Sequence, residues 1–165
     1  MKRVAILGSG GAGKTWLANE LGRRTGLPVV HLDRIFWAPG WSERDPEEAQ
    51  AALRAEVARD EWILDGNFLN RLGPERLSRA DTVVFLDVGR LTCLRRVLSR
   101  RARNERRADL PDGCPERWDG AFYRWIWRYP QDDRPAVLSL LHGLAADVYR
   151  LRSRRAVERF LEEAA

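Results

Sequence analysis

An eight-residue glycine-rich segment near the N-terminus constrains the fold more than any other part of the chain. Gly8-Ser9-Gly10-Gly11-Ala12-Gly13-Lys14-Thr15 fits G-x-x-x-x-G-K-[ST], the phosphate-binding loop. Residues 3–7 form a short apolar run before it, typical of a buried strand, and Leu17, Ala18 and Leu21 follow at helical spacing. A glycine turn that only joins a strand to a helix is the plain alternative. The strand, loop and helix together are the context that nucleotide binding requires, so we favour the phosphate loop.

The chemistry of such a loop follows from its residue types. Glycines let backbone N–H groups crowd around phosphate oxygens, and the helix N-terminus adds partial positive charge. Lys14 is expected to reach the β- and γ-phosphates of ATP, and Thr15 to place its hydroxyl on Mg²⁺. The residues expected to bind nucleotide are Gly8, Ser9, Gly10, Gly11, Ala12, Gly13, Lys14, Thr15 and Trp16. The loop alone does not distinguish a kinase from an ATPase or a GTPase.

Apolar runs that alternate with helical patterns indicate the fold class. The predicted strands are 3–7, 28–32, 62–65, 82–87 and 147–151, each nearly continuous in apolar residues as in a parallel sheet. The prediction is a single α/β domain over 1–165: a three-layer α/β/α P-loop NTPase fold with a five-stranded parallel sheet. No apolar run reaches membrane-spanning length, so a soluble cytoplasmic protein is expected. The two cysteines have no metal spacing; Cys93 fits a helix core and Cys114 has no expected role.

The segments between these strands give more local predictions. Asp45-Pro46 marks a helix start, whereas the aromatic residues 35–41 look too irregular for a helix. A long helix from about Leu91 is expected to direct Leu91, Leu94 and Leu98 inward and to expose Arg96, Arg100, Arg103 and Arg107. In a helix over 116–129, ended by Pro130, one stripe contains Trp118, Phe122, Trp125 and Tyr129. That stripe is more typical of a core than of a base-stacking platform.

The charge balance limits the partners. The chain has 29 basic and 24 acidic residues, a formal net charge of +5, and Lys2 and Lys14 are its only lysines. This suits phosphate-bearing partners, either nucleotides or nucleic acid, because arginine matches phosphate oxygens bidentately. A GC-rich genome would also replace lysine by arginine, so the composition alone does not choose between these partners.

Several motifs resemble those of adenylate kinase-like P-loop kinases. They are the phosphate loop, the Trp62–Gly66 strand end, the Ala80–Asp87 strand and the arginines of 93–101. The resemblance is closest to the bacterial topology modulation proteins, which share His31-Leu-Asp33, Trp37-x-Pro39-Gly40-Trp41, Asp65-Gly66-Asn67, Arg124-Trp-Ile-Trp127 and Leu151-Arg-Ser-Arg-Arg155. Adenylate kinases have Asp-Gly-Phe-Pro-Arg after the third strand, where this chain has Asp65 to Arg71 with the arginine displaced. Only a short arginine-rich lid, about 100–118, fits in this chain.

This resemblance implies roles for individual residues. Asp33 follows the second strand, where shikimate- and uridine-kinase-like enzymes have an acid, and it is expected to accept a proton from an acceptor hydroxyl. Asp65 and Asp87 end strands as metal-side acids do, and the choice between them stays open. Arg96 and Arg100 are expected to stabilise the transferring phosphoryl group. The expected acceptor-binding residues are Asp33, Trp37, Asn67, Arg71, Arg124 and Arg128, with Trp41 as a pocket wall.

Two functions from different classes follow. The first is an ATP- and Mg²⁺-dependent phosphotransferase that acts on a small molecule: a nucleoside, a nucleotide or another hydroxyl compound. The second is a nucleic-acid-binding or DNA-topology-affecting protein that binds ATP, although no helix-turn-helix or RRM motif is visible. A GTPase switch ranks third, because the chain has no Asn-Lys-x-Asp guanine motif.

Overall fold

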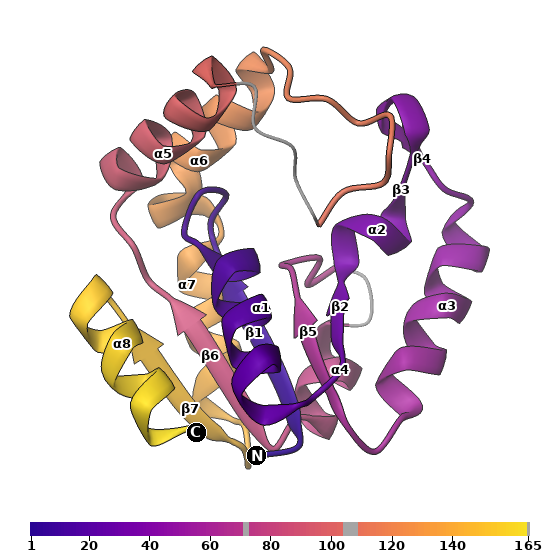
Figure 1. Ribbon diagram of the computed structural model, residues 1–165, viewed down its shortest axis with the longest axis vertical. Coiled ribbons are helices and arrows are strands. Elements are labelled where there is room, and N and C mark those ends of the chain that lie inside the picture. The colour runs from indigo at the N-terminus through magenta and orange to yellow at the C-terminus, as the bar shows by residue number, and fades with distance from the viewer. Residues whose placement is uncertain (71–72, 104–108, 165) are drawn as a thin grey trace.

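The sheet follows the predicted strands closely. In the computed structural model, which describes residues 1–70, 73–103 and 109–164, five parallel strands lie in the order β2-β5-β1-β6-β7 (Figure 1). Their bounds are β1 Arg3–Gly8, β2 Val29–His31, β5 Trp62–Asp65, β6 Thr82–Leu86 and β7 Asp147–Leu151. The register pairs Ile6 of β1 with Asp65 of β5, and His31 of β2 with the same Asp65. The strands that carry the predicted site residues are therefore direct neighbours.

Alternation along the strands divides the interior into two cores. Val4 and Ile6 of β1 face one core, and Ala5 and Leu7 face the other. The first core packs against helices α1 (Lys14–Thr25) and α8 (Arg154–Glu163), through Leu17, Leu21, Phe160 and Leu161. The second packs against α2 (Leu32–Phe36), α3 (Pro46–Ala58), α4 (Gly73–Arg79) and α7 (Arg134–His142). This is the three-layer α/β/α architecture that the sequence predicted.

Two helices lie together beyond the end of the sheet where the phosphate loop is found. They are α5 (Arg90–Ala102) and α6 (Gly120–Asp132), seen above α1 in Figure 1. The inward face of α5 is Cys93 and Val97, whereas Leu91 is 69% exposed and Leu98 is 42% exposed. The prediction that Leu91 and Leu98 face inward is therefore wrong, because the helix is rotated to bury the smaller side chains against the phosphate loop.

The aromatic helix also differs from its prediction. Trp118 lies before α6 and is 71% exposed, so it does not belong to a buried stripe, while Tyr129 is buried. Pro130 lies inside α6, which continues to Asp132. A proline within the last turn leaves most of the hydrogen-bond ladder intact, so the helix does not stop there.

The segment predicted as an irregular aromatic loop is ordered in short elements. Ile35 and Phe36 complete α2, and then β3 (Trp37–Ala38), a 3₁₀ turn η1 (Pro39–Trp41) and β4 (Ser42–Glu43) make a small antiparallel hairpin. We call 37–43 the aromatic hairpin. Phe36 is buried against the second core, which explains why the helix forms despite its short length. The predicted start of α3 is confirmed, since the Asp45 carboxylate caps it by accepting from the N–H groups of Glu47 and Glu48.

Within residues 1–70, 73–103 and 109–164, none of the helices has both the length and the apolar character needed to cross a bilayer.

Candidate functional site

The phosphate loop is held open by glycines that nothing larger could replace. Gly11 and Gly13 have φ values of 77° and 103°, a region that side-chain-bearing residues rarely adopt. A Cβ at Gly10 would lie 2.6 Å from the ring of Phe122, and one at Gly11 would collide with the carbonyl oxygen of Cys93. The loop is therefore closely packed under α5 and α6, and its glycines form the kind of cradle that a triphosphate fits.

Lys14 and Thr15 have the positions that the motif requires. The Lys14 ammonium donates to the carbonyl oxygens of Gly8 at 3.0 Å and Ser9 at 3.2 Å, so it lies over the mouth of the loop. The Thr15 hydroxyl donates to a carboxylate oxygen of Asp109 at 3.0 Å. Asp109 is only 4% exposed, and nothing in the sequence motif pointed to it.

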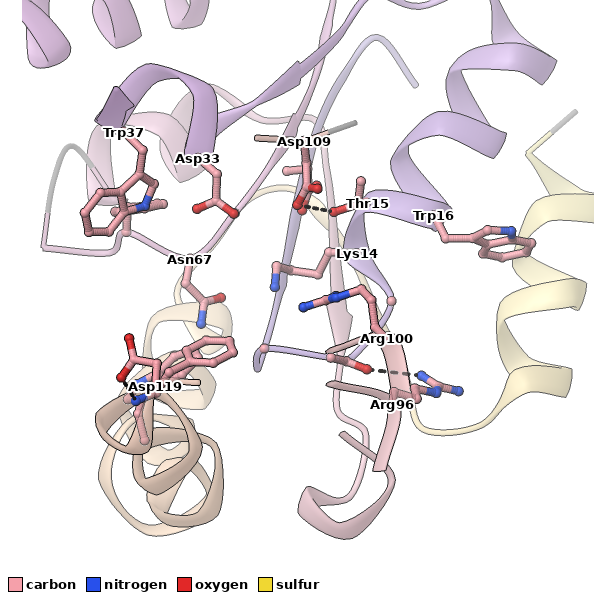
Figure 2. Close-up of a pocket in the computed structure, with 18 of the residues that line it drawn as sticks. Lys14, Thr15, Trp16, Asp33, Trp37, Asn67, Arg96, Arg100, Asp109 and Asp119 are labelled. Carbon is pink, nitrogen blue, oxygen red and sulfur yellow. Dashed lines mark hydrogen bonds between the residues drawn. The ribbon is translucent and has the colours of Figure 1, made fainter. Parts of the chain in front are cut away.

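A cavity of about 1400 Å³ connects this loop to the neighbouring strand ends. Lys14, Thr15 and the arginines of α5 line one side of it. Asp33, Trp37 and Asn67 line the other side, and their polar groups face Lys14 across the opening (Figure 2). Such a cavity is large enough for two small-molecule substrates.

The lining of the cavity combines aromatic and polar groups. Trp37 comes from the aromatic hairpin, Phe68 from the segment after β5, and Phe122 and Trp125 from α6. Asp33 is in the first turn of α2 instead of at a strand end, so the sequence placed it in the correct neighbourhood but in the wrong element. Its carboxylate and the amide of Asn67 lie across from Lys14 in Figure 2.

Asn67 links the two sides of the cavity. Its side-chain oxygen accepts from the backbone N–H of Gly8 at 3.0 Å, and its backbone oxygen accepts from Arg76 at 2.8 Å. Arg76 is fully buried, and burial lowers the pKa of its guanidinium to about 10, although the Asp65 carboxylate opposes that shift. These contacts fix the segment after β5 against the phosphate loop.

Asp65 lies at the base of the cavity and is 4% exposed. One of its oxygens lies 3.0 Å from Nδ1 of His31, and the other is buried without a hydrogen-bond partner. His31, which the sequence analysis left without a role, therefore orients an acid that the sequence had proposed for the metal. Across the described ranges 1–70, 73–103 and 109–164, no three His, Cys, Asp or Glu side chains form a ready-made metal cluster.

Asp87, the other acid proposed for the metal, lies elsewhere. Its carboxylate accepts from Arg134 at 2.8 and 3.1 Å and from Arg150 at 2.8 and 2.6 Å, and it does not line the cavity. Burial raises the pKa of Asp87, but the hydrogen bonds from Arg134 and Arg150 outweigh it and leave the pKa below its ordinary value. The geometry contradicts the proposed metal-side position of Asp87, because these arginines of α7 and β7 draw the carboxylate away from the loop.

Arg96 and Arg100 both line the cavity, with different contacts. Arg96 donates to the backbone oxygens of Ala12 at 2.9 Å and Gly11 at 3.4 Å, so it braces the phosphate loop from α5. Arg100 forms an ion pair with Glu116, with 2.6 Å between Nε and Oε1. In Figure 2 the Arg100 guanidinium lies beside Lys14, whereas that of Arg96 is directed to the backbone of the loop.

Two other predicted arginines lie away from the cavity. Arg124 and Arg128 are exposed on α6, where Arg128 pairs with Asp132 at 2.7 Å, and neither lines the cavity. Their placement contradicts the predicted acceptor contact, because the face of α6 that meets the loop is the one with Phe122 and Trp125. Arg71 and Arg107, and residues 104–108 of the predicted lid, lie outside the described residues.

A strap of residues 110–117 crosses from the Asp109 side of the cavity to the aromatic hairpin. The N–H of Gly40 donates to the oxygen of Gly113 at 2.9 Å, and the indole of Trp41 donates to the oxygen of Pro115 at 2.8 Å. The Arg117 guanidinium lies 5.0 Å from the Trp41 ring. Trp41 and Arg117 also line the cavity, so hairpin and strap together form its cover.

A second cavity, of about 640 Å³, lies on the other side of the phosphate loop. Gly13, Trp16 and Arg96 line both cavities, which are therefore neighbours along the loop. Apolar and polar groups from the start of α5 and of α8 complete it: Val88, Thr92, Arg152, Ser153 and Val157 among them. Sequence reasoning had assigned site roles to Ala12, Gly13, Trp16 and Arg96 of this lining, but it gave none to the residues after β7, because that segment carries no recognised nucleotide motif.

The comparisons with known proteins are consistent with this geometry. No protein-family model matches the chain, and no curated protein matches it at a significant level. Its structure is similar to that of a shikimate kinase from Acinetobacter baumannii in complex with shikimate, with a TM-score of 0.66, 15% identity, and coverage of 99% of this chain and 90% of that one. It is also similar to a shikimate kinase from Bacteroides thetaiotaomicron, with a TM-score of 0.60, 18% identity, and coverage of 98% and 95%.

At 15% and 18% identity these similarities show the fold alone, which is that of the P-loop kinases. The chain thus has a phosphate loop in the expected structural context, with a cavity beside it that contains Lys14, Thr15, Asp33 and Asp65.

Proposed function

We propose that this protein is an ATP-dependent phosphotransferase that moves the γ-phosphate of ATP to a hydroxyl group of a small molecule. The observation that carries the proposal is the second side of the main cavity, where Asp33, Trp37 and Asn67 face Lys14 (Figure 2). A protein that only binds ATP needs no such compartment beyond the triphosphate. Two solved structures of similar fold are those of shikimate kinases, and one of them contains shikimate.

The nucleotide would lie along the phosphate loop. The base would enter the second cavity beside Trp16 and Val157, and the triphosphate would meet Lys14 and the backbone N–H groups of the loop. Arg96 and Arg100 would stabilise negative charge on the transferring group. Thr15, with a neighbouring carboxylate, fits a divalent cation, and Mg²⁺ held there would neutralise charge on the β- and γ-phosphates.

The acceptor would occupy the side of the cavity with Trp37. Asp33 would receive the proton that leaves the hydroxyl of the acceptor molecule. Asn67 would donate a hydrogen bond to that molecule or accept one from it. The described lining of the cavity includes the carboxylates of Asp33, Asp65 and Asp133. A phosphate acceptor would be repelled by such carboxylates, which favours a hydroxyl compound such as a nucleoside or a sugar.

The test is ADP release by the purified protein with ATP and Mg²⁺ against panels of nucleosides, sugars and nucleoside monophosphates, and against DNA. We expect turnover only with a hydroxyl acceptor, and a loss of about 10²–10⁴-fold in Asp33→Asn. Asp112→Asn is the control, because this substitution removes the same charge from an exposed position. DNA-dependent turnover, or faster transfer to a monophosphate in Asp33→Asn, would show the proposal to be wrong.

A further inference from the structure

Asp109 is a buried carboxylate at the phosphate loop that the loop motif does not include. It is 4% exposed, it lines the main cavity, and its oxygen accepts from the Thr15 hydroxyl at 3.0 Å. Asp109 therefore brings a negative charge directly beside the Thr15 hydroxyl.

Thr15 is the side chain that the loop motif assigns to the metal. A carboxylate within hydrogen-bond distance of that hydroxyl lies where the metal of a metal–ATP complex is bound. One of the two acids proposed for the metal, Asp87, is hydrogen-bonded to Arg134 and Arg150 outside the cavity. Asp109 supplies from another part of the chain the charge that Asp87 does not.

A second observation points to a cation in the same cavity. The Asp65 oxygen that does not contact His31 is buried without a hydrogen-bond partner. Figure 2 also shows the carboxylates of Asp33 and Asp109 pointing into the space beside Lys14. Oxygen ligands of this kind, one or two per ion with phosphates and water completing the set, are what Mg²⁺ prefers.

The chain itself holds Asp109 in this position. Leu110, the next residue, is 2% exposed, and the strap that follows is bonded to the aromatic hairpin through Gly113 and Pro115. Asp109 is therefore attached to the acceptor side of the cavity while its carboxylate contacts the nucleotide side.

We propose that Asp109 binds the divalent cation of the metal–ATP complex together with Thr15, and that its charge excludes ATP that carries no metal. The inference rests on the proposed ATP binding. Without a cation, the carboxylate and the triphosphate repel each other; with a cation between them, both are attracted to it. At an effective dielectric constant of about 20, a unit charge within several ångströms changes affinity by about tenfold or more.

The experiment measures the dissociation constant of ATP by calorimetry, once with excess Mg²⁺ and once with EDTA. The wild-type chain, Asp109→Asn and Asp112→Asn are compared. In Asp109→Asn we expect tighter binding of metal-free ATP and weaker binding of Mg-ATP, so that the ratio of the two constants falls by about tenfold or more. Asp112→Asn, which removes a charge from an exposed position three residues away, is expected to leave the ratio unchanged.

Each outcome decides between explanations. If Asp109→Asn strengthens the binding of metal-free ATP and of Mg-ATP equally, Asp109 only blocks the loop sterically and the inference is overturned. Any other result that leaves the ratio of the two dissociation constants unchanged also overturns it. Asp109→Ser keeps a hydrogen-bond acceptor for Thr15 without the charge and is the second variant if Asp109→Asn does not fold. A wild-type chain that binds ATP equally with and without metal refutes the inference alone, whereas one that binds no ATP refutes the proposed function as well.

Discussion

Replacing Asp87 by Asn should damage stability and leave metal dependence unchanged. The carboxylate, 10% exposed, receives four hydrogen bonds from Arg134 and Arg150. Breaking a buried ion pair costs about 3–5 kcal/mol. The two arginine side chains are 32% and 33% exposed, so water partly replaces the lost contacts. The expected loss in free energy of unfolding is therefore about 2–3 kcal/mol, or a Tm lower by about 5–10 °C.

The pH dependence of this loss has a definite sign. The hydrogen bonds from Arg134 and Arg150 hold the pKa of Asp87 below its ordinary value despite the opposing effect of burial. A group with a depressed pKa in the folded state stabilises the protein above its unfolded pKa of about 3.9. That stability is lost as the pH falls through the lower folded pKa. The difference between wild type and Asp87→Asn should therefore be full at pH 7 and shrink below about pH 4.

The assay is urea unfolding of both chains between pH 3 and 7, with ATP binding measured at several Mg²⁺ concentrations at pH 7. Arg152→Gln is a useful control, because Arg152 approaches Asp87 only to 3.6 Å and is 64% exposed. It should cost about 0–1 kcal/mol. If Asp87→Asn retained wild-type stability but lost its Mg²⁺ dependence, the structural assignment of Asp87 would be refuted.

Three further substitutions test the reaction itself. Lys14→Ala should abolish phosphoryl transfer without changing the circular dichroism spectrum, because Lys14 contacts the loop mouth and not the core; near-wild-type turnover would contradict the kinase proposal. Arg96→Ala should lower both kcat and ATP affinity, since Arg96 also braces the backbone of Gly11 and Ala12. Arg100→Ala should lower kcat by about 10²-fold with little change in ATP affinity, and a loss confined to affinity would show a simple binding contact.

Much of the fold could be predicted because the information is local. The parallel strands are continuous apolar runs, and Asp45 and Ser153 cap α3 and α8 as their sequence positions indicate. The rotation of α5 could not be predicted in this way. Leu91 and Leu98 have the right spacing for a buried face, but α5 meets Gly11 through the backbone of Cys93 and the side chain of Val97, so Cys93 and Val97 face inward.

The candidate site was predictable where one motif contains the whole geometry, as in Gly8 to Thr15. It was not predictable where side chains meet through long-range contacts. Asp65 and Asp87 look alike in the sequence, because each is an acid at a strand end. They differ in the structure because His31 contacts Asp65, whereas Arg134 contacts Asp87. Asp109 lies 94 residues from Thr15 in the chain, and no local pattern connects them.

The pairing of Ile6 and His31 with Asp65 has a consequence for the entropy of the proposed reaction. Strands β2 and β5 end at the level of Ile6 in β1, and the Asn67 amide joins the segment after β5 to Gly8. The residues proposed to bind ATP and those proposed to bind the acceptor are thus positioned by neighbouring strands of one hydrogen-bonded sheet. Bringing two reactants into alignment can account for about 7–11 kcal/mol of a reaction barrier. In this protein the rigid sheet sets that alignment during folding, before either substrate binds.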